Sequence, residues 1–168
     1  MEVSENKDDI AEVAKSVLET LLSLMDVSAS VMLSTALLPG GEEEGAADSI
    51  TLEIEGEDLG ILIGRRGQTL SCLQYIVRLI VGHQTKVWLP IIIDVEGYKR
   101  RRYDALQAIA WRMAEMVKTR GEPFALEPMS AFDRRIIHLT LADHPDVTTQ
   151  SSGEGEARKV VILPKEQL

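Results

Sequence analysis

The decapeptide Ile61-Leu62-Ile63-Gly64-Arg65-Arg66-Gly67-Gln68-Thr69-Leu70 decides how this 168-residue chain is interpreted. Its two glycines bracket two arginines where one short helix stops and a longer amphipathic helix starts. Glycine lets the backbone approach a ligand closely, and a helix N-terminus offers unpaired N–H groups and a positive dipole end to a phosphate. A lone G-x-x-G would favour a simpler interpretation, a helix-ending glycine followed by exposed arginines. The order of the surrounding helices and strands therefore has to distinguish a phosphate-binding loop from a simple helix end.

The residues before and after the decapeptide predict a helix–strand–strand–helix–helix–strand order. The predicted elements are a helix over 9–25, strands over 28–38 and 49–55 joined through a charged turn at 39–45, a short helix or turn over 58–63, a helix that ends at Gly82, and a strand over 86–95. Apolar residues recur at three- and four-residue spacing in the first helix, and residues 49–55 alternate apolar and polar side chains. Pro90 cannot donate a ladder hydrogen bond, which places the last strand at a sheet edge or a bulge.

The second half of the sequence predicts a helix–strand–helix–strand–strand order, joined to the first half at Gly97. Its predicted elements are a long helix over 98–119 closed by Gly121, an extended piece over 124–129, a helix opened by Ser130, and a hairpin of strands 147–151 and 159–163 around Gly153–Gly155. Asp133 lies three residues after Ser130, the spacing of a capping box.

In this order of elements, the first half resembles a type II KH domain, whose G-x-x-G loop clamps the backbone of single-stranded nucleotides. The stretch 63–70 together with Leu73-Gln74-Tyr75 resembles the bacterial Jag (SpoIIIJ-associated, KhpB) family. Tyr98-Lys99-Arg100-Arg101-Arg102, Glu127-Pro128-Met129 and the C-terminal stretch 147–164 extend the resemblance. Arg134 and His138 fit the signature of the R-three-H domain, a single-stranded nucleic-acid module.

This resemblance implies an α+β fold of two small domains in tandem. They are a type II KH domain over 8–97, with the order αββααβ, and an R-three-H domain over 98–168, with the order αβαββ. Many members of the family carry a separate N-terminal domain, whereas this sequence starts almost directly at the KH helix. We therefore do not expect partnerships tied to that domain to carry over.

The candidate nucleic-acid contacts are glycines, basic side chains and one histidine: Gly64, Arg65, Arg66, Gly67, Gln68, Lys99, Arg100, Arg102, Arg134, Arg135 and His138. The basic run 99–102 either lines a groove or is a solvated face, and at most two of its side chains can point the same way. Arg134 and His138 share a helix face because they are four residues apart. The imidazole either contacts the ligand, by stacking or as a protonated donor to phosphate, or packs structurally and orients the site.

The charge distribution allows a polyanionic ligand although the net charge is −9. Residues 1–60 hold 15 Asp and Glu against two Lys, a net of −13, whereas residues 61–168 hold 12 acids and 16 bases, a net of +4. Cys72 is the only cysteine, which excludes an internal disulfide and a cysteine-based zinc cluster. The sequence has no signal peptide and no apolar run that could insert into a membrane, so we expect a cytoplasmic protein. No metal and no cofactor are expected.

The favoured function is non-enzymatic binding of single-stranded RNA by a post-transcriptional regulator or RNA chaperone, with single-stranded DNA as an alternative ligand. The family resemblance also suggests a small stand-alone KH protein, or a second copy of the chain, as a partner. The alternative is a protein-interaction adaptor in which the KH fold is a docking surface, which the acidic first sixty residues favour. A phosphate-ester hydrolase using His138 would lack a partnered base, a nucleophile or a metal cluster.

Overall fold

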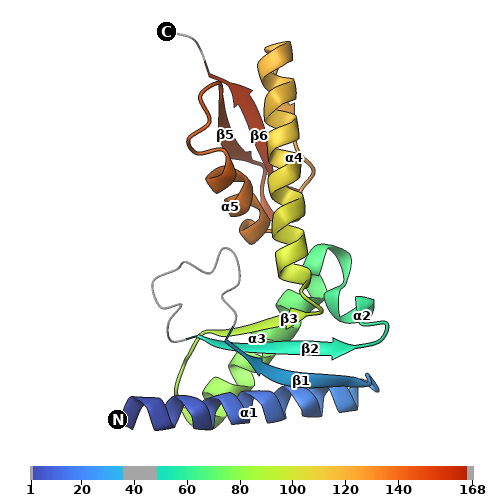
Figure 1. The fold of residues 1–168 in the computed structure, drawn as a ribbon, viewed down its shortest axis with the longest axis vertical. Helices are drawn as coiled ribbons and strands as arrows, with labels where there is room; N and C mark the ends of the chain where they lie inside the picture. The colour runs from blue at the N-terminus through green and yellow to red at the C-terminus, as the bar shows by residue number, and fades with distance from the viewer. Residues whose placement is uncertain (1, 36–48, 166–168) are drawn as a thin grey trace. The chain divides into compact units, whose positions relative to one another are not determined.

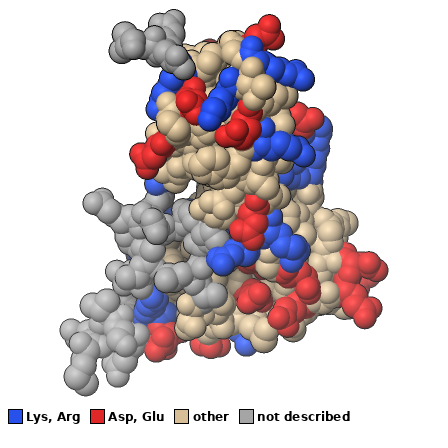
Figure 2. Space-filling model, turned by 45° about the horizontal axis from the view of Figure 1, so that its top comes forward, with Lys and Arg blue, Asp and Glu red and all other residues tan. Residues whose placement is uncertain are grey.

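The computed structural model describes residues 2–35 and 49–165, with side chains from residue 7 onward. The chain forms two compact units, Met1–Arg100 and Arg101–Leu168 (Figure 1). This division falls in the first turn of one helix, slightly beyond the boundary predicted between 97 and 98. The surface carries charges of both signs (Figure 2). The predicted turn at 39–45 lies outside the described residues.

The first unit has the predicted αββααβ order. Its elements are α1 (Glu2–Leu24), β1 (Ala29–Ser34), β2 (Ile50–Gly56), α2 (Gly60–Ile63), the 3-10 turn η2 (Arg65–Gly67), α3 (Gln68–Thr85) and β3 (Ile91–Val95). The sheet has the order β1-β2-β3, with β1 antiparallel and β3 parallel to β2. The mixed α+β class expected from the sequence is confirmed.

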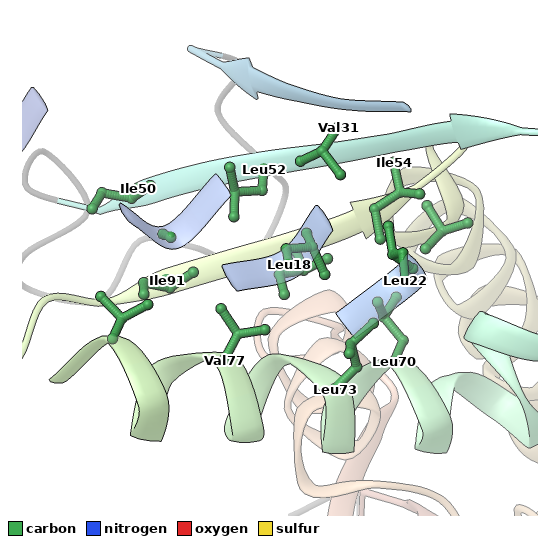
Figure 3. Close-up of a cluster of buried hydrophobic side chains, with 14 of the residues drawn as sticks. Leu18, Leu22, Val31, Ile50, Leu52, Ile54, Leu70, Leu73, Val77 and Ile91 are labelled. Carbon is green, nitrogen blue, oxygen red and sulfur yellow. The ribbon is translucent and has the colours of Figure 1, made fainter. Parts of the chain in front are cut away.

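The core of the first unit lies between the sheet and helices α1 and α3 (Figure 3). The alternation in β2 buries Ile50, Leu52 and Ile54 on one face of the sheet. Leu18 of α1 and Val77 of α3 are fully buried in the same cluster. The period of two in the strand and the period near 3.6 in the helices therefore turn their apolar faces toward one another.

The helix predicted to end at Gly82 continues to Thr85, so this prediction was wrong. Gly82 is buried within α3, and a Cβ atom there would lie 2.7 Å from Cε3 of the Trp88 indole. Glycine at this position therefore permits close packing of a ring on the helix. The helix ends where Lys86 takes a left-handed conformation, with φ of 60°.

Strand β3 is an edge of the sheet, as Pro90 predicted, although it begins at Ile91 and not at residue 86. Side-chain oxygens of the same unit accept hydrogen bonds from two backbone N–H groups of this strand. The N–H of Ile93 donates to Oε1 of Gln74 at 3.1 Å, and the N–H of Val95 donates to Oδ1 of Asp94 at 2.9 Å. These bonds give the two amides partners without a further strand.

The second unit has the predicted αβαββ order. Its elements are α4 (Tyr98–Arg120), whose first residues belong to the first unit, β4 (Phe124–Ala125), α5 (Ala131–Thr140), β5 (Val147–Ser152), the 3-10 turn η3 (Gly155–Ala157) and β6 (Lys159–Pro164). The sheet is antiparallel with the order β4-β6-β5. Its core joins Ala110 of α4, Ile137 of α5 and Ile162 of β6, all fully buried. Among the described helices of both units, none is long and apolar enough to cross a membrane.

Candidate nucleic-acid interface

The G-x-x-G loop (Gly64–Gly67) has a backbone that favours glycine at both of its ends. Gly64 has φ of 67° and ψ of −169°, and Gly67 has φ of 79°. A Cβ atom at Gly64 would lie 2.0 Å from Oγ1 of Thr69, and one at Gly67 would lie 3.0 Å from Cε1 of Tyr98. The glycines therefore permit both the left-handed backbone and the close packing around the loop.

The loop leads directly into the N-terminus of α3. Gly67 is the N-cap residue of α3 and has no side chain with which to cap the first N–H groups. Gln68 begins the helix, and Arg65, Arg66 and Gln68 are all exposed. Arg66 is itself left-handed, with φ of 55° and ψ of 33°. The loop thus combines exposed guanidinium groups with the positive end of an 18-residue helix.

Lys99 of the predicted basic run is half-buried within the first unit. Its Nζ donates to Oε1 of Gln74 at 2.7 Å, and its backbone N–H donates to Oδ1 of the buried Asp94 at 3.0 Å. Burial lowers the pKa of Lys99 from 10.5 to about 8, although the nearby Asp94 carboxylate opposes this shift. Arg100, the next residue, is exposed.

Arg102 forms an ion pair inside the second unit. Its Nη2 lies 2.7 Å from Oδ2 of Asp133 and its Nε lies 3.2 Å from the same oxygen. The Ser130 hydroxyl accepts a hydrogen bond from the Asp133 N–H, as the capping box predicted. The Asp133 carboxylate, however, holds Arg102 of α4. The guanidinium of Arg102 therefore joins two helices.

The α5 surface (Arg134, Arg135 and His138) is the second group of predicted contacts. Arg134 donates from Nη1 to the backbone oxygen of Met129 at 2.8 Å, and Arg135 is exposed. His138 is half-buried against β5. Its Nδ1 lies 2.7 Å from Oγ1 of Thr149, and its Nε2 lies 2.9 Å from Oγ of Ser151. Partial burial, and then the charge of Arg134, lower the pKa of His138.

The predicted contacts are divided between the two units. The loop residues, Lys99 and Arg100 belong to the first unit, and Arg102 and the α5 surface belong to the second. Lys99, Arg102, Arg134 and His138 each have a hydrogen-bond partner within their own unit. Sequence reasoning did not single out Gln74, Thr149 or Ser151 as partners of site residues. The hydroxyl spacing in the predicted strand 147–151 was an available signal, because side chains two apart share a face. Among the described residues, no cluster of His, Cys, Asp and Glu could hold a metal ion.

Comparisons with known proteins match both halves of the chain. Residues 40–92 match the family described as KhpA/KhpB, KH domain, and residues 104–164 match the R-three-H domain family. An RNA-binding protein KhpB of Clostridium symbiosum is 32% identical over 164 residues, which cover 98% of this chain and 70% of the relative. The chain belongs to the KhpB family. The resemblance to the Jag family noted from the sequence is thereby confirmed.

Two further KhpB relatives are longer than this chain. An RNA-binding protein KhpB of Bacillus subtilis is 34% identical over 119 residues, covering 70% of this chain and 57% of the relative. An RNA-binding protein KhpB of Streptococcus pneumoniae is 29% identical over 161 residues, covering 94% of this chain and 46% of the relative. This chain thus spans about half the length of these two KhpB proteins.

Proposed function

We propose that this KhpB-family chain binds single-stranded RNA through the G-x-x-G loop and the α5 surface, and that it does so without catalysing a reaction. The observation that carries the proposal is the loop itself. Two glycines with positive φ lead into the start of α3, where no side chain caps the first N–H groups and where Arg65, Arg66 and Gln68 are exposed, and a phosphodiester accepts hydrogen bonds from such N–H groups. The relatives named RNA-binding protein support RNA as the ligand.

We infer a second contact with the RNA at the α5 surface. Arg134 and Arg135 are adjacent arginines on one helix, and a guanidinium suits a phosphate because it offers several donors in one plane. Single-stranded RNA fits both surfaces because its bases are unstacked and its backbone is free to follow a loop. In the cell, the chain would act in the cytoplasm as a post-transcriptional regulator or an RNA chaperone, with single-stranded DNA as a second ligand of the same chemistry.

Exposed apolar side chains on α3 favour a second function, protein docking. Tyr75, Ile76 and Leu79 of α3 are 62%, 45% and 41% exposed, and their spacing puts them on one helix face. A small stand-alone KH protein, or a second copy of this chain, would cover that face. This docking would leave the loop, at the start of the same helix, available to RNA.

The test of RNA binding is fluorescence anisotropy with a labelled, unstructured RNA of twelve nucleotides and with the same RNA annealed to its complement. We expect the single strand to bind more tightly. The variant Arg65→Asp/Arg66→Asp should lose affinity at least tenfold, because it places two negative charges where phosphates bind and retains both glycines.

The matched control is Arg78→Asp/Lys86→Asp, which makes the same change of charge on exposed residues farther along or just beyond α3. It should lose less than threefold. Equal losses in the two variants would mean that total charge and not the loop governs binding. No measurable RNA binding by the wild-type chain would favour the docking function.

A further inference from the structure

Two hydroxyl groups of β5 hold both ring nitrogens of His138. Thr149 and Ser151 are two residues apart, so their side chains leave the strand on the same face, and both are half-buried. Thr148 and Ser152 are exposed on the opposite face. The two hydroxyl oxygens lie 2.7 and 2.9 Å from Nδ1 and Nε2 of the imidazole. Strand β5 therefore contacts both nitrogens of the His138 ring.

Partial burial and the neighbouring Arg134 favour a neutral imidazole in this arrangement. A neutral ring has one nitrogen that donates and one that accepts, and a hydroxyl group can serve either of them. From α5, the charged side chain acting on the ring is Arg134, which disfavours a second positive charge, and the facing groups of β5 are uncharged hydroxyls. With both nitrogens engaged by the sheet, the ring carbons and the ring face are what His138 can offer to a ligand.

We propose that Thr149 and Ser151 are positioning residues of the α5 surface, which turn both nitrogens of His138 toward β5 so that the imidazole meets a nucleobase or ribose while Arg134 and Arg135 bind phosphate. This inference rests on the proposed RNA binding of the α5 surface. It assigns a role to two residues of β5 that do not themselves touch RNA. It also gives His138 a role different from that of a protonated donor to phosphate.

The test is a mutant cycle in the full chain, measured by anisotropy with the same twelve-nucleotide RNA. Thr149→Val/Ser151→Ala should weaken binding three- to tenfold, whereas Thr149→Ser, which keeps the hydroxyl, should retain wild-type affinity. In a His138→Ala background, removal of both hydroxyls should cost less than twofold, because residues that act through one group are not additive. The control Thr148→Val/Ser152→Ala alters the other face of β5 and should be neutral.

The pH dependence gives a readout that general damage to the fold would not produce. Wild-type affinity should change less than twofold between pH 8 and pH 6, because a neutral ring takes no part in phosphate binding. Binding that strengthens fivefold or more at pH 6, and loses that gain in His138→Ala, would overturn the proposal. The titration of the His138 ring, followed by NMR, should have its midpoint below that of a histidine in an unstructured peptide.

The two proposals fail in different ways. Full affinity of both Arg134→Ala and His138→Ala would remove the α5 surface from the RNA site and with it this inference. Loss of affinity in those variants, combined with wild-type affinity of Thr149→Val/Ser151→Ala or with full additivity in the cycle, would overturn the positioning role alone. If the double variant melts at a lower temperature, the Thr149→Ser and Ser151→Ala single variants decide the same question.

Discussion

Arg66 occupies a left-handed position that glycine would fill without strain. Its φ of 55° costs an L-residue about 1 kcal/mol, and a glycine there would lose that strain while gaining freedom in the unfolded chain. We therefore expect Arg66→Gly to change the free energy of unfolding by less than about 1 kcal/mol. RNA affinity should still fall about threefold or more, because a guanidinium beside the start of α3 is lost. Urea unfolding and anisotropy on the same preparation separate the two effects.

Gly64→Ala is the opposite case and serves as the comparison. At φ of 67° and ψ of −169° the backbone is almost inaccessible to alanine, and the added methyl would collide with Thr69. We expect a loss of about 2–4 kcal/mol in the free energy of unfolding. If Gly64→Ala unfolds at the wild-type urea concentration, the loop does not have the backbone described above.

The lowered pKa of Lys99 predicts that the stability of the folded chain depends on pH. Its pKa is about 8 in the folded chain and 10.5 as an unperturbed side chain, so between these values the folded state binds fewer protons than the unfolded state. The unfolding free energy must therefore rise with pH across this window, because the cost of burying the charge is present below pH 8 and is relieved above it. We expect the wild type to gain stability from pH 7.5 to pH 9.5 relative to Lys99→Met.

The fluorescence of Trp88, in a Trp111→Phe background, reports unfolding of the first unit for this comparison. Lys99→Met cannot titrate at this position and leaves other groups unchanged, so it isolates the contribution of Lys99. Parallel pH profiles of the two chains would mean that the Lys99 amine is not desolvated.

At the scale of elements, the Arg102–Asp133 pair fixes α5 against α4. The Asp133 side chain is only 5% exposed, so removal of its partner leaves a buried carboxylate without a cation. Arg102→Ala should therefore lower the unfolding free energy of the second unit by about 2–4 kcal/mol. The exposed Arg112 on the same helix provides the control, and Arg112→Ala should stay within about 0.5 kcal/mol of the wild type. Trp111 fluorescence, in a Trp88→Phe background, follows this unit.

The same pair shows where sequence reasoning about elements stops. The G-x-x-G loop and the alternation of β2 were predictable because their signals lie in consecutive residues. Arg102 was grouped with the other cations of its run because its partner Asp133 lies 31 residues away. The partner of Lys99, Gln74, lies 25 residues before it, and His138 meets hydroxyls 11 and 13 residues later. Such contacts depend on how elements pack, which local periodicity does not contain.

Gly82 illustrates the same limit within one helix. A glycine near the end of an amphipathic pattern predicts a helix end, yet here it is the place where the Trp88 ring rests on α3. Both uses need a missing Cβ atom. Only the position of Trp88, which follows from the path of the chain into β3, distinguishes them.

At the scale of the whole molecule, the charges that remain exposed set the salt dependence of RNA binding. Of the predicted basic contacts, Lys99, Arg102 and Arg134 donate to partners within their units, whereas Arg65, Arg66, Arg100 and Arg135 are exposed. If about four of these bind phosphates, the logarithm of the association constant should fall against the logarithm of salt concentration with a slope near −3. Titrations between about 50 and 300 mM salt measure it, and a slope near zero would contradict phosphate binding.

A charge-reversed loop should change this slope as well as the affinity. Arg65→Asp/Arg66→Asp removes up to two phosphate contacts, so the slope should become shallower by about 1 to 1.5. A weakened variant that keeps the wild-type slope would mean that the arginines act on the loop and do not meet phosphate.

The hydrogen bonds that Gln74 and Asp94 make to β3 have a consequence for many copies gathered on one RNA. A long transcript that binds many copies raises the local protein concentration. At high concentration, an exposed strand edge can pair with strands of neighbouring chains, which leads to aggregation. In this chain, the Ile93 and Val95 amides of such an edge are already occupied from within. Neighbouring copies that meet at the β3 edge would find two of its backbone donors already paired, so this edge is a poor template for an added strand.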